Sequence, residues 1–462
     1  MIFERVESEG LAHYSYVLGD ESAGVCAVID PRRDVACYLD IARRHSVAIT
    51  ALLETHIHAD FVSGSCELAA RTGAPVYVGA GGEYGFEHRS LAGGETIEVG
   101  SLTLAVLQTP GHTPEHVCFL VSGGTGGEAP WGLFSGDTLF AGEVGRPDLL
   151  GEGTEERLAR RLFHSLRQKI IPLGDEIIIY PAHGAGSPCG ASIGERPTST
   201  IGYERRHNQT LALDDEVAFV EKVLANLSPA PTYYKKLKQI NAAGPATLGA
   251  WPHLKPLTAA EFHQALDQPD SVVVDAREIE AFGGAHIEGA LNIALRPRFP
   301  IWVGQVLAPE QRLLLVLPDE GKVDEALRHL LRVGYDNVGG YLRHGMRGWT
   351  EAGRPFVRLP QMSVQELKQH IERGDGLQVL DVRSEAEWEQ GAIPTARHVY
   401  APYLEQHLDR LDRQKPVVTY CGSGYRASIA ASILQRHGFG QVFNLPGSMD
   451  AWQAAGYPLE LP

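Results

Sequence analysis

Histidine and aspartate side chains occur in four short turns in the first half of the chain. Residues 55–61 read Thr-His-Ile-His-Ala-Asp-Phe, and His112, Asp137 and His183 follow in later turns rich in glycine, proline or threonine. Imidazole and carboxylate groups are ligands for zinc, iron and manganese. Two imidazoles and one carboxylate, from His56, His112 and Asp137, would make the ligand set of non-haem Fe(II) oxygenases. These turns therefore predict a metal site.

The residue at position 61 bears on how many metals this site holds. Residues 56–61 resemble the motif His-x-His-x-Asp-His, which opens the metal site of the metallo-β-lactamase superfamily. In that family the last histidine is a ligand of a second metal, but Phe61 has no lone pair to donate. The resemblance therefore implies one metal. His58, Asp60 and His183 would then hold water and orient the ligand imidazoles.

Short apolar runs alternate with amphipathic stretches over residues 1–245. Seven of these runs predict β-strands: Val25–Ile29, Ile49–Leu53, Pro75–Val78, Leu102–Leu107, Val117–Val121, Gly132–Ser135 and Glu176–Tyr180. The candidate metal ligands follow several of these strands directly, which is where layered α/β folds tend to place their sites. Helices are expected over 214–226 and 233–241, before a glycine- and proline-rich linker at 243–256. This order fits a layered αββα sandwich.

Four segments narrow the resemblance to one group within the superfamily. They read THIHADFVSG at 55–64, TPGHTPEH at 109–116, SGDTLFAGEVGRPD at 135–148 and YPAH at 180–183, and they look like segments of persulfide dioxygenases. These enzymes use one Fe(II), O2 and water to oxidise the outer sulfur of a low-molecular-weight thiol persulfide, which gives sulfite and the free thiol. The resemblance implies that His56, His112 and Asp137 bind the iron and that Arg146 lies near the substrate. Zinc is the alternative metal, because it accepts the same ligands.

Two further features bear on the substrate. Cys189 follows His183 by only six residues, so it could serve as a sulfur-handling thiol at the mouth of the pocket or equally as a structural cysteine. Tyr203 and Arg205 lie in the segment IGYERRHN and offer charge-assisted hydrogen bonds to the anionic tail of a thiol cofactor. The alternative for this pair is the solvated start of a helix.

The second half of the chain contains an internal repeat. Asp275 and Asp381 occupy equivalent places in the segments SVVVDAR and LQVLDVR, and their offset of 106 residues (381 − 275) recurs between Phe282 and Trp388. Two copies of about 100 residues predict two tandem α/β domains rather than a solenoid. The sequence therefore predicts three domains, at residues 1–245, 255–358 and 360–462.

A cysteine loop in the second copy has the features of a nucleophile. An apolar run at 417–420 predicts a strand, and the loop Cys-Gly-Ser-Gly-Tyr-Arg follows it before a helical stretch. Backbone N–H groups and the helix dipole stabilise a thiolate there, while Gly422 and Gly424 let the backbone curl around the sulfur. Arg426 adds positive charge and a grip for anions. Cys421 is therefore predicted to carry a sulfur atom as a persulfide.

This Cys-x-x-Gly-x-Arg loop resembles the active loop of the rhodaneses, which are sulfurtransferases. The segment around Asp381 and Trp388 adds to the resemblance. The first copy has Pro-Asp-Glu-Gly at 318–321 in place of the loop, and no cysteine occurs from 245 to 358. The first copy is therefore expected to have a rhodanese-like fold without sulfurtransferase chemistry. It would serve as a spacer, a docking surface or half of an interface.

Together these patterns predict a bifunctional enzyme of persulfide detoxification. Oxidation of a thiol persulfide at the metal would give sulfite, and sulfur transfer at Cys421 would convert sulfite to thiosulfate. The alternative is a glyoxalase-II-like thioester hydrolase with two metals, whose rhodanese-like domains serve only for docking. Phe61 argues against this alternative because it removes a ligand of the second metal. A homo-oligomer is expected by analogy with the fold alone.

The composition limits the partners and the compartment. The chain has 462 residues, 44% of them hydrophobic, and a formal net charge of −16, which is typical of a globular multidomain protein. This charge disfavours nucleic acid or an anionic membrane surface as the main partner. No signal peptide and no membrane span are expected from the apolar runs. The six cysteines lack paired spacing, so a reducing cytoplasm is the expected location.

Overall fold

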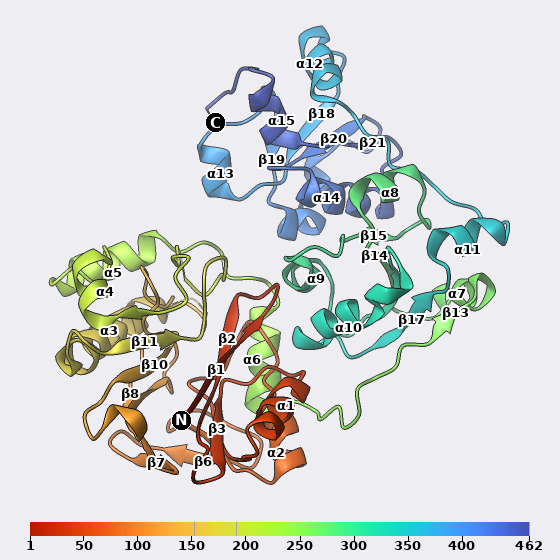
Figure 1. The fold of residues 1–462 in the computed structure, drawn as a ribbon. Helices are drawn as coiled ribbons and strands as arrows, with labels where there is room; N and C mark the ends of the chain where they lie inside the picture. The colour runs from red at the N-terminus through yellow and green to blue at the C-terminus, as the bar shows by residue number, and fades with distance from the viewer. Residues whose placement is uncertain (152, 191, 462) are drawn as a thin grey trace. The chain divides into compact units, whose positions relative to one another are not determined.

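The protein was analysed as a computed structural model, which describes residues 1–151, 153–190 and 192–461 (Figure 1). The chain forms two compact units. The first comprises Met1–Pro252 with Leu331–Gly334, and the second comprises His253–Leu330 with Tyr335–Pro462. No helix in the described part of the chain has both the length and the apolar character needed to cross a membrane.

Within the described residues, the first unit contains two six-stranded sheets (Figure 1). The first sheet has the order β1 (Ile2–Ser8), β2 (His13–Asp20), β3 (Val25–Ile29), β4 (Ala48–Leu53), β5 (Val76–Gly79) and β6 (Arg89–Leu91). The second has the order β12 (Ser199–Thr200), β11 (Ile178–Pro181), β10 (Gly132–Gly136), β9 (Val117–Gly123), β8 (Leu102–Gln108) and β7 (Thr96–Val99).

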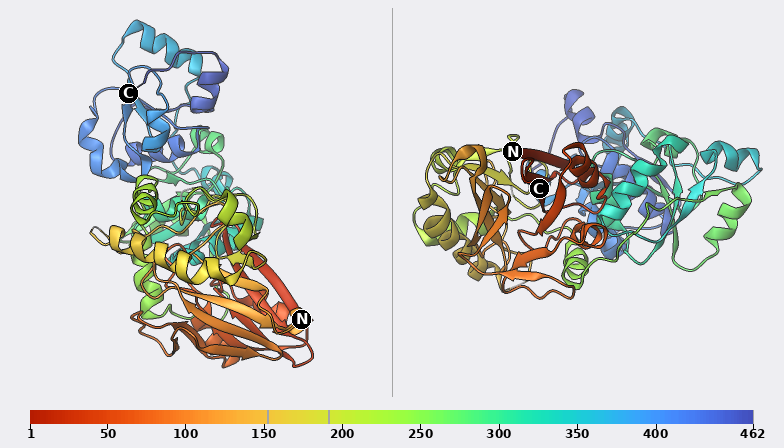
Figure 2. Two further views of the ribbon diagram at one scale, coloured as in Figure 1. Left: turned by 90° about the vertical axis from the view of Figure 1, so that its left-hand side faces the viewer. Right: turned by 60° about the horizontal axis from the view of Figure 1, so that its bottom comes forward.

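Six α-helices accompany these sheets in the described residues: α1 (Ala36–Arg44), α2 (Ser65–Thr72), α3 (Glu155–Ser165), α4 (Ile201–His207), α5 (Glu216–Ala225) and α6 (Tyr234–Ala243). One apolar core, which includes β1, β2 and β3 on one side and β8, β9 and β10 on the other, joins the two sheets. A second core packs α1 and α2 on the first sheet, and a third packs α3 and α5 on the second sheet. The predicted αββα sandwich is thus confirmed, and its layers can be followed from two further directions in Figure 2.

Alternation of side chains along β8 shows how the sequence builds this core. Leu102, Leu104 and Val106 are fully buried between the two sheets, whereas the residues between them are partly exposed. Successive side chains of a strand point to opposite faces, so every second position reaches the core. Burial of each such side chain stabilises the fold by roughly 1.5–3 kcal/mol. The amphipathic strands are therefore positioned by their apolar faces.

In its described residues, the second unit contains two parallel sheets, one for each copy of the repeat. The first copy has the strand order β13 (Pro256–Leu257), β17 (Val338–Leu342), β16 (Arg312–Val316), β14 (Ser271–Asp275) and β15 (Leu291–Asn292). The second copy has the order β19 (Arg397–His398), β18 (Gln378–Asp381), β20 (Val417–Tyr420) and β21 (Val442–Asn444). Their helices are α7 (Ala259–Leu266), α8 (Ile279–Gly284), α9 (Phe299–Val306), α10 (Val323–Arg332), α11 (Gly345–Glu351), α12 (Val364–Arg373), α13 (Glu385–Glu389), α14 (Tyr425–Arg436) and α15 (Ser448–Ala454).

The two copies share an ion pair at the end of the central strand, with the aspartate fully buried in each. Asp275 binds Arg277 at 2.6 Å in the first copy, and Asp381 binds Arg383 at the same distance in the second. Each arginine also donates to a backbone carbonyl eight residues further on, at 2.7 Å. The repeat seen in the sequence is therefore also present in the side-chain contacts that hold each domain together.

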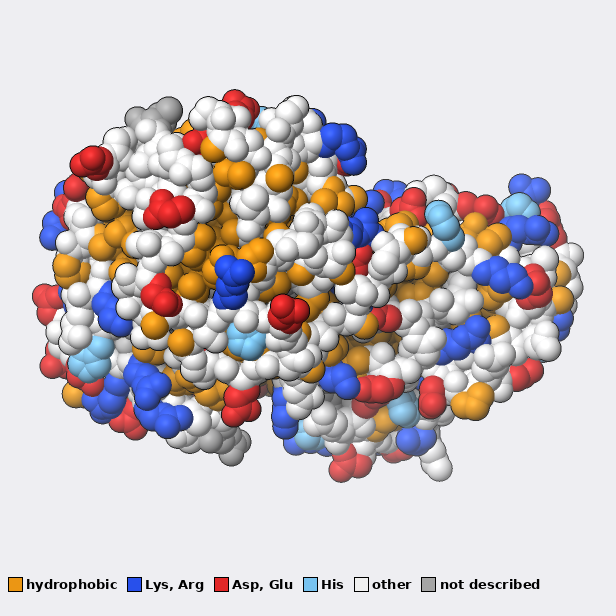
Figure 3. All heavy atoms as spheres, turned by 90° about the horizontal axis from the view of Figure 1, so that it is seen from below, with side chains coloured by type: hydrophobic (Ala, Val, Ile, Leu, Met, Phe, Trp, Pro, Cys, Tyr) orange, Lys and Arg blue, Asp and Glu red, His pale blue; other side chains and the backbone are white. Residues whose placement is uncertain are grey.

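Charged side chains of both signs are mixed on the molecular surface drawn in Figure 3. Lys and Arg side chains alternate there with Asp and Glu side chains and form no continuous basic surface on that face. Proteins that bind nucleic acid collect their basic residues on one face or along one helix. The expectation that nucleic acid is not a main partner stays a prediction from the net charge of −16.

Candidate metal centre and candidate cysteine site

The three predicted metal ligands follow the ends of β4, β8 and β10 and converge on one place. Asp137 Oδ2 lies 3.3 Å from His112 Nε2 and 3.8 Å from His56 Nε2. One ligand atom from each residue lies within 4.8 Å of the other two, and all three side chains are buried. The structure thus brings together the set that the sequence predicted from three separate turns.

Neighbouring groups fix which ring nitrogen of each histidine carries the proton. His112 Nδ1 donates to the backbone carbonyl of Arg146 at 2.7 Å, and a carbonyl can only accept. Thr55 Oγ1 donates to Asp30 at 2.9 Å, so it accepts from His56 Nδ1, also at 2.9 Å. In both rings Nε2 therefore keeps a free lone pair directed toward Asp137. Such partners on the far side of a ring are typical of metal-binding histidines.

The charge state of this cluster suits a divalent cation. Burial lowers the pKa of His56 and of His112, so both imidazoles are neutral. Burial alone would raise the pKa of Asp137, but the charge and the hydrogen bond of His183 outweigh burial and hold that pKa below its ordinary value. Within the described residues, His112 Nε2 and Asp137 Oδ2 are buried without a hydrogen-bond partner. A buried polar atom left unpaired costs about 1–3 kcal/mol, and a bound metal would remove that cost.

Asp60 and His183, which the resemblance assigns to a second metal site, bind each other. His183 donates from Nδ1 to Asp137 at 2.7 Å and from Nε2 to Asp60 at 2.8 Å. Burial lowers the pKa of His183, but the two carboxylates outweigh it and raise the pKa to about 10. With both nitrogens protonated, the ring has no lone pair for a metal. Phe61 is fully buried, and its ring centroid lies 3.9 Å from that of His13.

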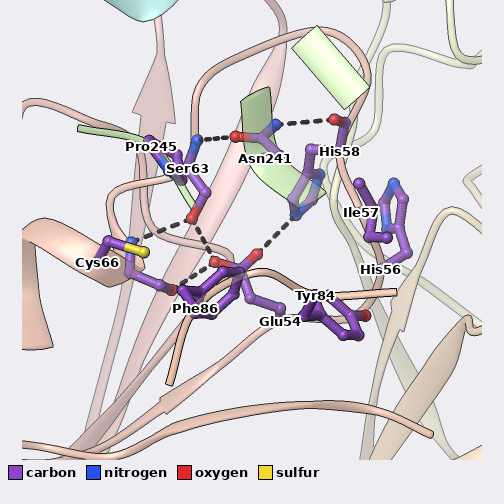
Figure 4. A pocket seen from close by; sticks show the side chains of 11 residues that line it. Glu54, His56, Ile57, His58, Ser63, Cys66, Tyr84, Phe86, Asn241 and Pro245 are labelled. Atoms are coloured by element: carbon purple, nitrogen blue, oxygen red, sulfur yellow. Dashed lines mark hydrogen bonds and ion pairs between the residues drawn. The ribbon is translucent and has the colours of Figure 1, made fainter. Parts of the chain in front are cut away.

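His58 points into a different cluster. Its Nε2 lies 3.1 Å from Asp30 Oδ1 and 3.2 Å from Glu54 Oε2, and these carboxylates overcome the effect of burial and raise its pKa well above the ordinary value. Figure 4 shows Glu54 between His58 and Ser63. The Ser63 hydroxyl donates a hydrogen bond to the Glu54 carboxylate. A cavity of about 10 Å³ adjoins this cluster, which is room for about one water molecule. The predicted contact of His58 with water is compatible with this space.

Two residues that the sequence analysis did not single out position the ligand turns. His116 Nε2 accepts the backbone N–H of Asp137 at 2.9 Å, and Glu115 Oε1 accepts the backbone N–H of Ile57 at 3.0 Å. Burial lowers the pKa of His116 to about 3, which keeps this ring neutral and able to accept. Both residues lie in the segment TPGHTPEH, so their proximity to His112 was the available signal.

Arg146 contributes to the site through its backbone. Its guanidinium is bound by Asp148 at 2.7 Å and by the carbonyls of Pro188 and Ser228 at 2.9 Å and 2.7 Å. Among the described residues, it is its carbonyl that contacts a predicted metal ligand, His112. The role of Arg146 beside the substrate stays a prediction, since its side chain is occupied in the present state.

Cys189 lies beside the metal cluster. Its Sγ is 3.6 Å from the hydroxyl of Tyr234, and it forms a group with Asp60 and His183 whose atoms lie within 4.8 Å of one another. Burial raises the pKa of this thiol well above its ordinary value, so the thiol is protonated. The predicted role in binding substrate therefore remains a prediction for a buried, uncharged thiol.

Tyr203 and Arg205 lie on the exposed face of α4. Arg205 forms a surface ion pair with Asp175 at 2.7 Å, and the guanidinium of Arg196 covers the ring of Tyr203 at 3.8 Å. Among the described residues, none of the contacts of this pair reaches the three predicted metal ligands. Their proposed contact with a thiol cofactor stays a prediction, and the structure does not bring them to the cluster.

A histidine at position 61 is expected to create a second metal site. In the Phe61→His variant, the new imidazole would join Asp60, His183 and Asp137, and a second zinc would displace one proton from His183. The zinc content should therefore rise from about one toward about two ions per chain. The matched Phe61→Leu variant keeps the position apolar and should stay at about one ion. Elemental analysis after dialysis with zinc measures both. If Phe61→His also stays at about one ion, this position does not set the number of metals.

The cysteine site lies between β20 and α14. Gly424, with φ of 108°, begins α14 and donates its N–H to Cys421 Sγ at 3.1 Å. The backbone N–H of Cys421 donates to Ser448 Oγ at 3.0 Å. In the first copy of the repeat, the Asp319 carboxylate accepts the N–H of Gly321 at 2.8 Å. Leu317 holds the position of Cys421 in the first copy, because Val316 pairs with Asp275 as Tyr420 pairs with Asp381.

Arg426 is bound by a carboxylate that the sequence analysis did not single out. Its two terminal nitrogens lie 2.6 Å and 2.7 Å from the oxygens of Glu387, which is a bidentate pair. Burial raises the pKa of Glu387, but the pair with Arg426 outweighs it and lowers the pKa to about 2. In the present state Arg426 therefore binds Glu387 of its own domain, and its predicted binding of an anion stays a prediction.

Loss of the ion pair between Glu387 and Arg426 is expected to slow sulfur transfer. The Glu387→Gln variant keeps the shape but loses the charge, so Arg426 and its loop are less well fixed; we expect kcat to fall about fivefold. The matched control is Glu389→Gln, which changes an exposed residue of the same helix. Thiosulfate–cyanide transfer rates measure both. A rise in kcat/KM for Glu387→Gln would show instead that Glu387 masks Arg426 from the substrate.

Comparison with known proteins gives the family of each part. The model described as "Metallo-beta-lactamase superfamily" matches residues 9–183, and "Rhodanese-like domain" matches residues 258–352 and 363–455. The solved metallo-beta-lactamase from Staphylococcus aureus subsp. aureus COL is 35% identical, with a TM-score of 0.68, over 74% of this chain and 99% of that one.

Two further relatives match a smaller share of the chain. A hydroxyacylglutathione hydrolase from Pseudomonas entomophila (strain L48) is 34% identical over 37% of this chain. The matched part covers 61% of the length of that protein. The structure of ETHE1 from Myxococcus xanthus is 27% identical over 53% of this chain and 99% of that one, with a TM-score of 0.46. The match to the Staphylococcus aureus protein extends over nearly all of that protein, and both rhodanese matches follow the sandwich. The chain therefore belongs to the metallo-β-lactamase superfamily and carries two rhodanese-like domains after its metallo-β-lactamase domain.

Proposed function

We propose that the metallo-β-lactamase domain is an Fe(II)-dependent dioxygenase of low-molecular-weight thiol persulfides. The observation that carries the proposal is the cluster of two neutral imidazoles and one carboxylate, His56, His112 and Asp137, whose free lone pairs converge in a buried place. This is the ligand set of mononuclear non-haem iron oxygenases. Both ring nitrogens of His183 donate hydrogen bonds to carboxylates, which supports one metal rather than two.

The proposed reaction is R–S–SH + O2 + H2O → R–SH + SO3²⁻ + 2 H⁺. The outer sulfur loses four electrons, O2 accepts them, and the S–S bond breaks to release the thiol. When bound, Fe(II) supplies open coordination positions for O2 and for the persulfide. The chain contributes the fixed orientation of both imidazoles, and His183 holds Asp137 in place through its Nδ1 proton. Substitution of the bound metal by zinc would retain binding but not redox chemistry.

We further propose that Cys421 transfers the sulfur. Its thiolate would attack a thiol persulfide and keep the outer sulfur: Cys–S⁻ + R–S–SH → Cys–S–S⁻ + R–SH. Sulfite from the first site would then accept that sulfur: Cys–S–S⁻ + SO3²⁻ → Cys–S⁻ + S2O3²⁻. The short Gly424 N–H contact to the sulfur supports the thiolate that both steps need. All six cysteines are free, which supports a reducing compartment such as the cytoplasm.

A thioester hydrolase is the second candidate. The similarity to a hydroxyacylglutathione hydrolase favours it. It requires that the metal centre cleave a thioester without O2 and that the rhodanese-like domains have another role. A second metal would help such a reaction by activating water, and Phe61 removes one of its ligands.

The deciding experiment measures O2 uptake and sulfite formation on one sample. Protein purified without oxygen and loaded with Fe(II) receives glutathione persulfide or coenzyme A persulfide, and its metal content is determined in parallel. The proposal expects O2 uptake with sulfite in equal amounts and about one iron per chain. Two bound zinc ions with thioester cleavage and no O2 uptake would establish the hydrolase instead.

A further inference from the structure

The Cys-less copy of the repeat packs directly on the helix that follows the cysteine loop. Both copies belong to the same compact unit. Asn292, at the end of β15 in the first copy, accepts from Ser428 Oγ of α14 at 2.5 Å, and its backbone N–H donates to Ser432 Oγ at 3.1 Å. All four of these groups are buried. Helix α14 is thus anchored in part by residues of the other domain.

The contact continues into the cysteine loop itself. The hydroxyl of Tyr425 donates to the backbone carbonyl of Ala294 in the first copy at 3.0 Å, in a buried position. Arg296 of the same segment lies over the Tyr425 ring at 5.5 Å. At Gly424, a Cβ atom would lie 3.4 Å from the side chain of Ile279 in the first copy. Tyr425 therefore contacts the Cys-less domain, and Gly424 lies close to it.

The Asn292 side chain, which accepts the hydrogen bond from Ser428, is held in a fixed orientation. Asn292 donates both amide hydrogens, to the carbonyls of Asp275 and Arg277, at 3.0 Å each. Its Oδ1 is thereby left to accept from Ser428. The equivalent residue of the second copy, His398 (292 + 106), bonds to the Arg383 carbonyl within its own domain at 2.7 Å. The first copy thus uses this position to reach its neighbour.

We infer that the Cys-less copy is a positioning domain for the sulfur-transfer loop, with Tyr425 and Ser428 as the positioning residues through which it acts. Gly424, whose N–H points at the Cys421 sulfur, directly precedes Tyr425, so displacement of the Tyr425 hydroxyl moves that donor. The inference rests on the proposed sulfur transfer at Cys421. It goes further by giving a role to a domain that has no cysteine of its own.

Tyr425→Phe tests this role because it removes one hydroxyl and keeps the ring. We expect kcat for thiosulfate–cyanide transfer to fall about fivefold to tenfold, since one buried hydrogen bond is lost, while KM changes less than about twofold. Alkylation of Cys421 by iodoacetamide, followed by mass spectrometry of its peptide, should shift to higher pH because the thiolate is less well stabilised. Ser428→Ala, a small change on α14, should shift both readouts in the same direction.

Tyr457→Phe is the matched control. Tyr457 is a half-buried tyrosine of the second copy, and its change should leave both readouts unchanged. The inference is overturned if Tyr425→Phe and Ser428→Ala keep the wild-type alkylation profile and kcat. Failure of the proposed function looks different, because the wild-type protein itself would then transfer no sulfur. The alkylation profile still decides the positioning role in that case.

Discussion

The Asp137→Ala variant is expected to lose its metal and its O2 uptake. Asp137 Oδ2 is the one anionic ligand atom in the cluster, at 3.3 Å from His112 Nε2, and without it only neutral imidazoles remain. Changes to residues that merely support metal ligands lower affinity by about 10–100-fold, so loss of a ligand should exceed about 100-fold. Iron content and O2 uptake with glutathione persulfide, measured on the same preparation, test this.

The control for this variant keeps the site and changes a surface carboxylate. Asp40 is exposed and pairs with Arg43 on α1, so Asp40→Ala should keep the iron content and the O2 uptake of the wild type. Sulfur transfer at Cys421 should survive in both variants, because it occurs in the other compact unit. Asp137→Ala protein that retains about one iron and full O2 uptake would exclude Asp137 as a ligand.

The strands that the sequence predicted are those whose apolar runs show clearly. Val25–Ile29 became β3 without change, and the other six predicted runs became β4, β5, β8, β9, β10 and β11 with small shifts at their ends. Strands β1 and β2 were not predicted. All eight residues of β2 are buried although several carry polar atoms, and one of these finds its partner far along the chain: Tyr16 donates to the Pro181 carbonyl at 2.7 Å. Local sequence patterns contain no information about such partners.

The candidate ligands could be predicted from the sequence because their chemistry is a property of their own side chains. Their supporting partners could not, because several act through the backbone or from far along the chain. His112 is oriented by the carbonyl of Arg146, a group that every residue has. Asn241, far along the chain from the histidine turn, donates to the carbonyls of His58 and Phe61 at 2.8 Å and 2.7 Å. Only the fold brings such groups together.

At the cysteine loop, too, the reactive residues could be predicted from the sequence and their partners could not. The spacing of Cys421, Gly424 and Arg426 was visible in the sequence, and the structure shows Gly424 donating to the sulfur. The partner of Arg426 was not visible, since Glu387 precedes it by 39 residues on another helix. The use of Tyr425 and Ser428 for contact with the first copy was equally hidden, because it depends on how two domains pack.

The Cys421→Ser variant is expected to lose sulfur transfer and to keep its metal. A serine hydroxyl is not ionised near neutral pH and cannot hold a sulfur atom as a persulfide, so transfer from thiosulfate to cyanide should fall at least about 1,000-fold. Cys66→Ser is the matched control: this half-buried thiol lies on α2 in the first unit, and burial raises its pKa to about 11. If Cys421→Ser transfers sulfur like the wild type, the rhodanese-like domains are docking modules.

The two site variants together also test whether the sites work in sequence. Wild-type protein supplied with glutathione persulfide and O2 should release thiosulfate, because sulfite made at the metal accepts the sulfur held on Cys421. Cys421→Ser should accumulate sulfite instead, and Asp137→Ala should form thiosulfate only when sulfite is added. A mixture of the two variants should restore thiosulfate, since sulfite diffuses between molecules. A restored rate well below that of the wild type, at equal site concentrations, would indicate that sulfite passes between the sites of one chain before it escapes.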